Sequence, residues 1–302
     1  MAEKIAIRFL GTADAIPSIK RNHTSILINY KEESILIDCG EGTQRQFKYA
    51  KISPSKITRL LISHWHGDHV LGIPGLLQTM AFSDYNKTLH VYGPKGTKKY
   101  MDQILKTFVF YGNIKINVQE IDKEGVFFDN QDFYLEASMM THGTPCIAYN
   151  FIKKGILKIN KQKLKKSGLP QGPILKKIKE GQDIIYNGKK FRAKDLTYSE
   201  DNKKISIILD TSYNEKIPVF VKSADLMISE SNFASDLESK AKEYKHLTAK
   251  QVAEAAKKAK VKSLILTHIS QRYEKQPKKI LNEAKKIFKK VSIAKDLDFV
   301  SV

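Results

Sequence analysis

Four side chains that can bind a metal ion occur within six consecutive residues of this chain, in the run HWHGDH. The run follows a short apolar stretch, Leu60–Ser63, which is typical of a β-strand. In an extended segment His64 and His66 point to the same side and can reach one cation, whereas Asp68 and His69 turn toward a second position. Neutral imidazoles and a carboxylate suit Zn²⁺, and Mn²⁺ or Fe²⁺ are alternatives. An exposed loop with incidental histidines is the weaker interpretation, because four potential ligands directly follow an apolar strand.

Three further potential ligands follow other apolar runs, and binding groups gather at such strand ends in α/β sheets. Taken singly, each is more typical of a hydrogen-bonded structural residue. Together with the run HWHGDH they supply five histidines and two aspartates, enough for two cations that share one carboxylate. We therefore expect a dinuclear centre formed by His64, His66, Asp68, His69, His142, Asp210 and His268.

Such a centre predicts hydrolysis of a phosphodiester. Two metal ions about 3.5–4 Å apart hold a bridging water as hydroxide and stabilise the charge of an in-line displacement. Asp68 can orient that hydroxide and accept its proton. His246 is a candidate proton donor to the leaving oxygen, with Glu230 as its partner. Both have structural alternatives, because His246 can equally cap the following helix and Glu230 alone favours a structural role.

Short strand-like runs occur in two blocks that flank a charged segment. After the second block, Thr248 and Gln251 have the spacing of a helix capping box, and Pro277 favours the start of a last helix. We expect an α/β fold, a single domain over residues 1–302, with two sheets face to face under outer helices. The expected strands are Lys4–Leu10, Thr24–Ile28, Ser34–Ile37, Leu60–Ser63, Leu89–Tyr92, Ile114–Ile121, Phe133–Met139, Ala148–Ile152, Ile205–Leu209, Leu226–Ser229 and Ser263–Thr267.

The segment Lys153–Lys194, called the basic arm, carries thirteen lysines and one arginine against Glu180 and Asp183, in a chain of net charge +20. Neither its periodicity nor its composition predicts a full core, so we interpret it as an insertion. Long lysine side chains suit sequence-independent contacts with phosphates. The alternative is a solvated charged surface, but the local net charge of +12 (fourteen basic minus two acidic residues), together with the turn cluster GLPQGP within the arm, favours RNA binding. The candidate RNA-binding residues are Lys165, Lys166, Lys176, Lys177 and Lys179.

Composition excludes several classes of protein. Hydrophobic residues make up 41% and charged residues 28%, as in ordinary soluble domains. No apolar run approaches the roughly 20 residues that span a bilayer, and no signal segment opens the chain. Cys39 and Cys146 have no CxxC spacing, which argues against a disulfide framework or a cysteine-based zinc site. We expect a cytoplasmic protein without a membrane partner.

The motifs extend well beyond the metal-binding run and cover essentially the whole chain. The pattern resembles the ribonuclease Z branch of the metallo-β-lactamase superfamily, the endoribonucleases that process the 3′ ends of tRNA. HWHGDH specifies only the superfamily, whereas GEGTQRQF, the basic arm and the His-Leu-Thr element narrow the resemblance to the branch. The matching segments are FLGTADAIPSIKRN (9–22), LIDCGEGTQRQF (36–47), SHWHGDHVLGIPGLL (63–77), THGTPCIAY (141–149), GLPQGPILKKIKEG (168–181), LDTSY (209–213), SESNF (229–233) and HLTAKQVAEAA (246–256).

The resemblance implies a four-layer αββα sandwich with an inserted basic exosite arm at 153–194. It implies two zinc ions per subunit: one held by His64, His66 and His142, the other by Asp68, His69 and His268, with Asp210 bridging both. It also implies Asp68 as proton acceptor, with His246 and Glu230 assisting proton delivery to the leaving group.

The implied activity is removal of the 3′ trailer from precursor tRNA, leaving a 3′-hydroxyl on the tRNA. The implied assembly is a homodimer, in which the arm of one subunit presents RNA to the site of the other. Two departures bear on the details. Ile19 replaces a frequent basic residue in the segment tied to sensing the 3′ end, and Ser231-Asn232 replaces a more usual Ala-Thr after Glu230.

Two other functions use the same features. A small-molecule metallo-hydrolase (a thioesterase, a lactamase or a cyclic-nucleotide phosphodiesterase) or a general phosphodiesterase would keep the dinuclear site but has less use for a polycationic arm. A non-catalytic RNA-binding module would leave a complete ligand set idle. Metal analysis, and salt dependence of activity on RNA but not on small esters, separate these alternatives.

Overall fold

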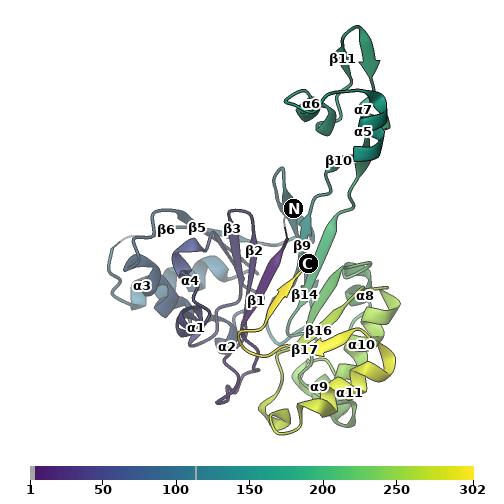
Figure 1. The fold of residues 1–302 in the computed structure, drawn as a ribbon. Coiled ribbons are helices and arrows are strands. Elements are labelled where there is room, and N and C mark those ends of the chain that lie inside the picture. The colour runs from purple at the N-terminus through teal and green to yellow at the C-terminus, as the bar shows by residue number, and fades with distance from the viewer. Residues whose placement is uncertain (1–3, 113) are drawn as a thin grey trace. The chain divides into compact units, whose positions relative to one another are not determined.

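The computed structural model describes residues 4–112 and 114–302, which divide into two compact units (Figure 1). The larger unit, called the body, comprises Met1–Phe128, Leu135–Phe151 and Lys204–Val302. The small unit comprises Asp129–Tyr134 and Ile152–Lys203 and contains the basic arm.

The first sheet of the body has seven strands among the described residues. Their spatial order is β18 (Phe299–Ser301), β1 (Ala6–Gly11), β2 (Ser25–Tyr30), β3 (Glu33–Ile37), β4 (Arg59–Leu61), β5 (Thr88–Gly93) and β6 (Lys115–Glu120). Pairs from β18 to β3 are antiparallel, and pairs from β3 to β6 are parallel. The loop after β4, which carries HWHGDH, therefore opens at the carboxyl edge of the parallel part.

The second sheet also has seven strands within the described part of the chain. Their order is β17 (Val291–Ile293), β16 (Leu264–Thr267), β15 (Leu226–Glu230), β14 (Lys203–Ile208), β9 (Cys146–Lys153), β8 (Phe133–Met140) and β7 (Gly125–Asp129). Strands β14, β15, β16 and β17 run parallel. The carboxyl ends of β14, β15 and β16 consequently lie at one edge of this sheet.

Helices cover the outer face of each sheet (Figure 1). Apolar side chains of α1 (Thr43–Tyr49), α3 (Ile73–Ala81) and α4 (Thr97–Thr107) share a core with the first sheet. Those of α8 (Lys216–Phe220), α10 (Ala249–Lys258) and α11 (Pro277–Ile287) share a core with the second. The inner faces meet through pairs such as Tyr30 and Phe151, whose ring centroids lie 5.8 Å apart. This layer order confirms the predicted α/β sandwich.

Local signals placed two helix starts correctly. The predicted capping box of Thr248 and Gln251 opens α10, and Pro277 is the first residue of α11. The remaining short elements of the body are η1 (Pro54–Lys56), α2 (Gly67–Val70), η2 (Ser235–Leu237), α9 (Glu238–Tyr244) and η3 (Gln271–Tyr273).

The small unit has a core of its own, which corrects the expectation drawn from its composition. Leu164, Leu169, Ile178 and Phe191 are among its buried apolar side chains. They come from separate short elements, so they form no helical or strand-like period in the sequence. The elements are β10 (Leu157–Ile159), α5 (Lys161–Ser167), α6 (Leu175–Lys179), β11 (Ile184–Tyr186), β12 (Lys189–Phe191), α7 (Ala193–Leu196) and β13 (Thr197–Ser199).

Candidate metal centre

The seven predicted ligands all belong to the body and come from strand ends of both sheets. The first sheet contributes the loop after β4 and helix α2, and the second contributes residues just beyond β8, β14 and β16. Gly40 and Gly72 allow the close packing around α2, because a Cβ at Gly72 would lie 2.1 Å from the carbonyl oxygen of Gly40. From the first sheet come His64, His66, Asp68 and His69, and from the second come His142, Asp210 and His268.

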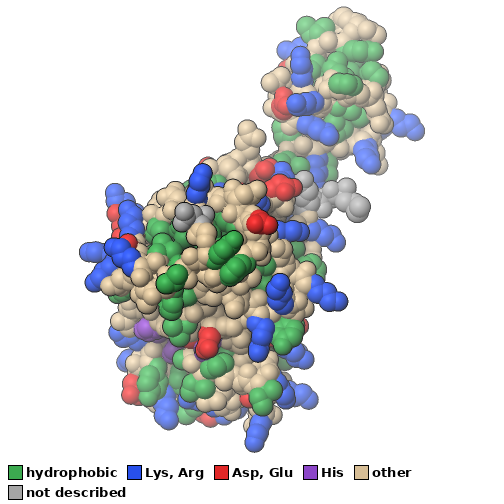
Figure 2. Space-filling model, turned by 90° about the vertical axis from the view of Figure 1, so that its left-hand side faces the viewer, with side chains coloured by type: hydrophobic (Ala, Val, Ile, Leu, Met, Phe, Trp, Pro, Cys, Tyr) green, Lys and Arg blue, Asp and Glu red, His purple; other side chains and the backbone are tan. Residues whose placement is uncertain are grey.

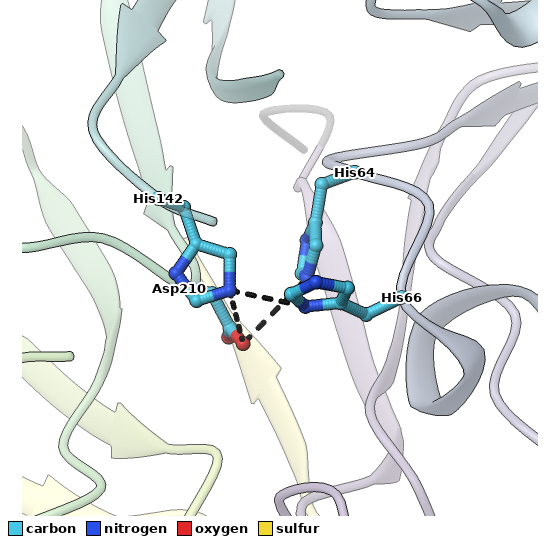
Figure 3. Close-up of side chains that lie close together, drawn as sticks. All are labelled: His64, His66, His142 and Asp210. Atoms are coloured by element: carbon cyan, nitrogen blue, oxygen red, sulfur yellow. Dashed lines mark hydrogen bonds and ion pairs between the residues drawn. The ribbon is translucent and has the colours of Figure 1, made fainter. Parts of the chain in front are cut away.

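Four of these side chains converge on one point (Figure 3): His64, His66, His142 and Asp210, whose ligand atoms all lie within 4.8 Å of one another. Nε2 of His142 lies 3.1 Å from Nδ1 of His66 and 3.8 Å from Oδ2 of Asp210. Nε2 of His64 lies 3.7 Å from the same aspartate oxygen. Three imidazole nitrogens and one carboxylate oxygen at this spacing make a ligand set for a divalent cation. We call this set the first ligand group.

A second ligand group lies beside the first and consists of Asp68, His69, Asp210 and His268. Nε2 of His69 lies 3.2 Å from Oδ2 of Asp68 and 3.5 Å from Oδ2 of Asp210. Nε2 of His268 lies 3.3 Å from Oδ2 of Asp68 and 3.2 Å from Oδ1 of Asp210. Asp210 belongs to both groups, so one carboxylate can serve two cations.

The chemistry of these residues fits bound cations. Nε2 of His64, Nε2 of His69 and Oδ1 of Asp210 are buried without a hydrogen-bond partner, an arrangement that costs free energy unless another ligand satisfies them. Burial lowers the pKa of His64 and of His142, which keeps both imidazoles neutral, as ligation requires. Burial alone would raise the pKa of Asp210, but His268 and His69 outweigh it and hold that pKa well below its usual range. The first ligand group therefore offers neutral imidazoles at His64 and His142 together with the ionised shared carboxylate of Asp210.

Outer hydrogen bonds orient the ligands. Nδ1 of His69 lies 2.6 Å from Oδ2 of Asp38, and the same carboxylate accepts bonds from the backbone and the hydroxyl of Ser63 at 2.7 and 2.6 Å. Nδ1 of His142 donates to the carbonyl oxygen of Lys245 at 3.0 Å. The bond made by one imidazole nitrogen fixes which nitrogen is free to bind a metal. His69 and His142 thus have their Nε2 atoms turned toward the ligand groups, whereas His66 faces His142 with its Nδ1.

His246 lies between α9 and α10, next to the ligand groups. Its Nδ1 is 3.1 and 3.2 Å from the two carboxylate oxygens of Glu230 and 3.9 Å from Oδ2 of Asp210. Burial lowers the pKa of His246, but Glu230 and Asp210 outweigh this effect and raise the pKa to about 9. The N-cap residue of α10 is Thr248, which excludes the alternative that His246 caps this helix. A protonated imidazole here can donate a proton beside the centre.

Relatives of known sequence match this chain along nearly its whole length. Ribonuclease Z of Bacillus cereus (strain B4264) is 37% identical to this chain over 302 residues, covering 96% of both proteins. The chain belongs to the ribonuclease Z family. The crystal structure of human tRNase Z, short form, has a TM-score of 0.71 and 25% identity, covering 98% of this chain and 99% of that one.

Two other comparisons are less specific than the ribonuclease Z match. A metallo-β-lactamase fold protein of Bacillus subtilis is 18% identical with a TM-score of 0.73, covering 99% of this chain and 100% of the other. That likeness shows the fold. A family model described as anti-Pycsar protein Apyc1 matches residues 5–139.

Sequence patterns predicted the seven side chains that converge in this ribonuclease Z family member, but they missed two groups that hold these side chains. Asp38 carries a usable signal, because it ends a strand in LIDCG as the ligands end theirs. Lys245 acts through its carbonyl oxygen, and a backbone group leaves no side-chain pattern to find. The five predicted RNA-binding lysines are exposed on α5 and α6 of the small unit.

Proposed function

We propose that this ribonuclease Z family member is a zinc-dependent endoribonuclease that removes the 3′ trailer from precursor tRNA and leaves a 3′-hydroxyl. The observation that carries the proposal is the convergence of seven ligands into two groups that share Asp210, in a chain 37% identical to a ribonuclease Z along 96% of its length. A binding module has no need of such a site.

Zinc is the cation that we propose for both groups, because five imidazoles and two carboxylates suit this borderline ion. Bound divalent cations would supply activation of a water molecule and stabilisation of negative charge at phosphorus. His64, His66, His142 and Asp210 would hold one, and Asp68, His69, Asp210 and His268 the other.

Two side chains would carry out the proton transfers of the reaction. Asp68 is the proposed acceptor of the proton of the attacking water, because its carboxylate belongs to the second ligand group and so lies beside the proposed cations. His246 keeps its proton to about pH 9 and delivers it to the leaving oxygen, while Glu230 holds the imidazole through Nδ1.

The small unit would bind the backbone phosphates of the RNA. Figure 2 shows lysine and arginine side chains projecting from its surface. Lys165 and Lys166 on α5, and Lys176, Lys177 and Lys179 on α6, are all exposed and suit contacts with backbone phosphates. Precursor tRNA is therefore the partner that we propose for this surface.

A homodimer is the assembly that we propose, and the body offers an apolar surface for it. Exposed apolar side chains gather near the ends of α3 and α4, on the face seen in Figure 2. Val109 is 99% exposed, and Phe82 stacks on Tyr111 with ring centroids 4.7 Å apart. Exposed apolar clusters of this kind mark interaction sites. We call this the apolar patch: Phe82, Leu105, Phe108, Val109 and Tyr111.

The cytoplasm is the location that we propose. Both cysteines, Cys39 and Cys146, are buried as free thiols, which suits a reducing compartment. No helix in the described residues is long and apolar enough to cross a membrane.

End mapping of a labelled precursor tRNA tests the proposed function. The zinc-loaded protein should cut once, on the 3′ side of the acceptor stem, and leave a 3′-hydroxyl. A parallel reaction with bis(p-nitrophenyl) phosphate reports the metal centre alone. Turnover of the small ester without any cut in the precursor would instead indicate a small-molecule or general phosphodiesterase.

A further inference from the structure

The turn that closes helix α9 has a lysine at its left-handed position. Lys245 has φ 57° and ψ 50°, in the left-handed region that favours glycine. Its N–H donates to the carbonyl of Lys242 at 3.3 Å, and the N–H of His246 donates to that of Ala241 at 2.8 Å. These two bonds form a Schellman motif, in which glycine is the usual left-handed residue. Lys51 and Lys260 close α1 and α10 with the same left-handed turn and the same pair of bonds. What distinguishes Lys245 is therefore the contact that its carbonyl makes.

Lys245 contacts a predicted metal ligand at two points. Its carbonyl oxygen accepts the Nδ1 hydrogen of His142 at 3.0 Å, and its ammonium group donates to the carbonyl oxygen of His142 at 3.4 Å. The opposite ring nitrogen of His142, Nε2, faces Asp210 and His66. Because the partner of one imidazole nitrogen orients the other, the carbonyl of Lys245 aims Nε2 into the first ligand group.

The same turn also positions His246, the proposed proton donor. His246 follows Lys245 directly, and its Nδ1 meets Glu230 at 3.1 Å. Beyond it, the segment is fixed again by Phe233, which donates to the carbonyl of Leu247 at 3.3 Å and accepts from the N–H of Ala249 at 2.9 Å. With both ends held, the backbone angles at Lys245 decide where the carbonyl and the next side chain point.

We propose that Lys245 is a positioning residue that sets His142 and His246 together, through its left-handed backbone and not through its ammonium group. This inference rests on the proposed function in one respect, since it requires a cation in the first ligand group. It extends that function by assigning one turn to two tasks, ligand orientation and proton delivery.

Three substitutions separate backbone from side chain, because each removes the ammonium group. Lys245→Gly and Lys245→Asn accept the left-handed conformation, whereas the β-branched side chain of Lys245→Val resists it. Titration of cation-free full-length protein with Co²⁺, followed by its absorption spectrum and by metal analysis, measures both cations. We expect Gly and Asn variants to bind both as the wild type does. The Val variant should bind the first-group cation roughly 10- to 100-fold more weakly, with the second cation unchanged.

A second measurement concerns the proton donor. At saturating cation, Lys245→Val should hydrolyse bis(p-nitrophenyl) phosphate at nearly the wild-type rate, since p-nitrophenolate leaves without a proton, but should cleave precursor tRNA slowly. The Gly and Asn variants should do both normally. If the Val variant does not fold, as judged by thermal unfolding, Lys245→Ala should show the same pattern at smaller amplitude.

Three outcomes would overturn or redirect the inference. Equal losses in all variants would assign the effect to the ammonium group, and no loss in any would make the carbonyl contact dispensable; either result defeats the proposal. A wild-type protein that binds fewer than two cations contradicts the proposed function itself, which distinguishes that failure from the failure of the role of Lys245.

Discussion

The carboxylate of Asp38 lies 2.6 Å from Nδ1 of His69, and both side chains are fully buried. Asp38 also accepts two bonds from Ser63, the residue before the first ligand, and its own φ of 55° is positive. One carboxylate therefore secures the start of the ligand loop and the orientation of a ligand in the second group.

Replacing Asp38 should weaken metal binding selectively. For Asp38→Ala we expect about 10- to 100-fold weaker binding of the second-group cation, and destabilisation of the fold by about 3–5 kcal/mol because buried partners lose their charge pair. Asp38→Asn should be milder, because its oxygen can accept from His69 and asparagine tolerates a positive φ. Metal titration and urea unfolding measure the two effects. Unchanged metal affinity in Asp38→Ala would refute the orienting role.

Removing the proposed proton acceptor should abolish cleavage but not RNA binding. Asp68→Ala is expected to show no measurable turnover of a precursor transcript, while the dissociation constant for that RNA changes little, because the lysines that bind it are untouched. Single-turnover cleavage and filter binding measure the two quantities. Unchanged turnover defeats the assignment of Asp68, and matched metal analysis shows whether a cation was lost as well.

The alkaline loss of activity should begin at a lower pH when Glu230 is replaced by glutamine. Glu230 and Asp210 raise the pKa of His246 to about 9, so the donor keeps its proton through neutral pH. In Glu230→Gln the carboxylate charge is gone and the pKa of His246 drops, which should move the alkaline limb of the kcat profile to lower pH. Glu124→Gln, whose carboxylate bonds to Ser138, Met139 and Lys216 and not to His246, is the control. Superimposable limbs in Glu230→Gln and wild type would exclude Glu230 as the partner of His246.

Neutralising the basic arm should reduce the salt dependence of RNA cleavage. With Lys165, Lys166, Lys176, Lys177 and Lys179 changed to glutamine, kcat/KM for precursor tRNA should drop at low salt. The slope of its logarithm against log salt should become shallower by about 0.7–0.9 per lost phosphate contact. Hydrolysis of bis(p-nitrophenyl) phosphate should be unchanged.

A matched control carries the same charge change elsewhere: glutamine at Lys278, Lys285, Lys286, Lys289 and Lys290, which are all exposed. This variant should alter the salt slope less than the arm variant does. Equal slopes in the two variants would show that overall charge, and not the arm, governs RNA binding.

Charges placed in the apolar patch should produce a monomer. Phe108→Asp combined with Val109→Asp buries two carboxylates in any interface that uses this surface, which opposes association. Light scattering after size exclusion should report a dimer for the wild type and a monomer for the variant. Val219→Asp, at another exposed apolar position, is the control. A dimer that survives the double substitution places the interface elsewhere.

Side-chain chemistry at strand ends made the ligand set predictable. His142, Asp210 and His268 stand alone in the sequence, yet each follows an apolar run of the second sheet. Asp210 and His268 follow parallel strands, which bring their ends to one edge, and His142 follows β8 of the same sheet. The capping box at Thr248 and the start of α11 at Pro277 were predictable because their signals are local. The core of the small unit was not predictable from the sequence, since Leu164, Ile178 and Phe191 meet only after short irregular elements fold. The role of the Lys245 carbonyl was not predictable either, because backbone geometry follows from tertiary contacts.

The two sheets each carry part of every ligand group: His64 and His66 reach across to His142, and Asp68 and His69 to His268. A nascent chain in which only the first sheet has folded therefore has only part of each ligand group and would bind either cation weakly. Nuclease potential thus arises only when both halves of the sandwich have docked in register. Incomplete or misassembled copies would therefore lack a complete metal centre.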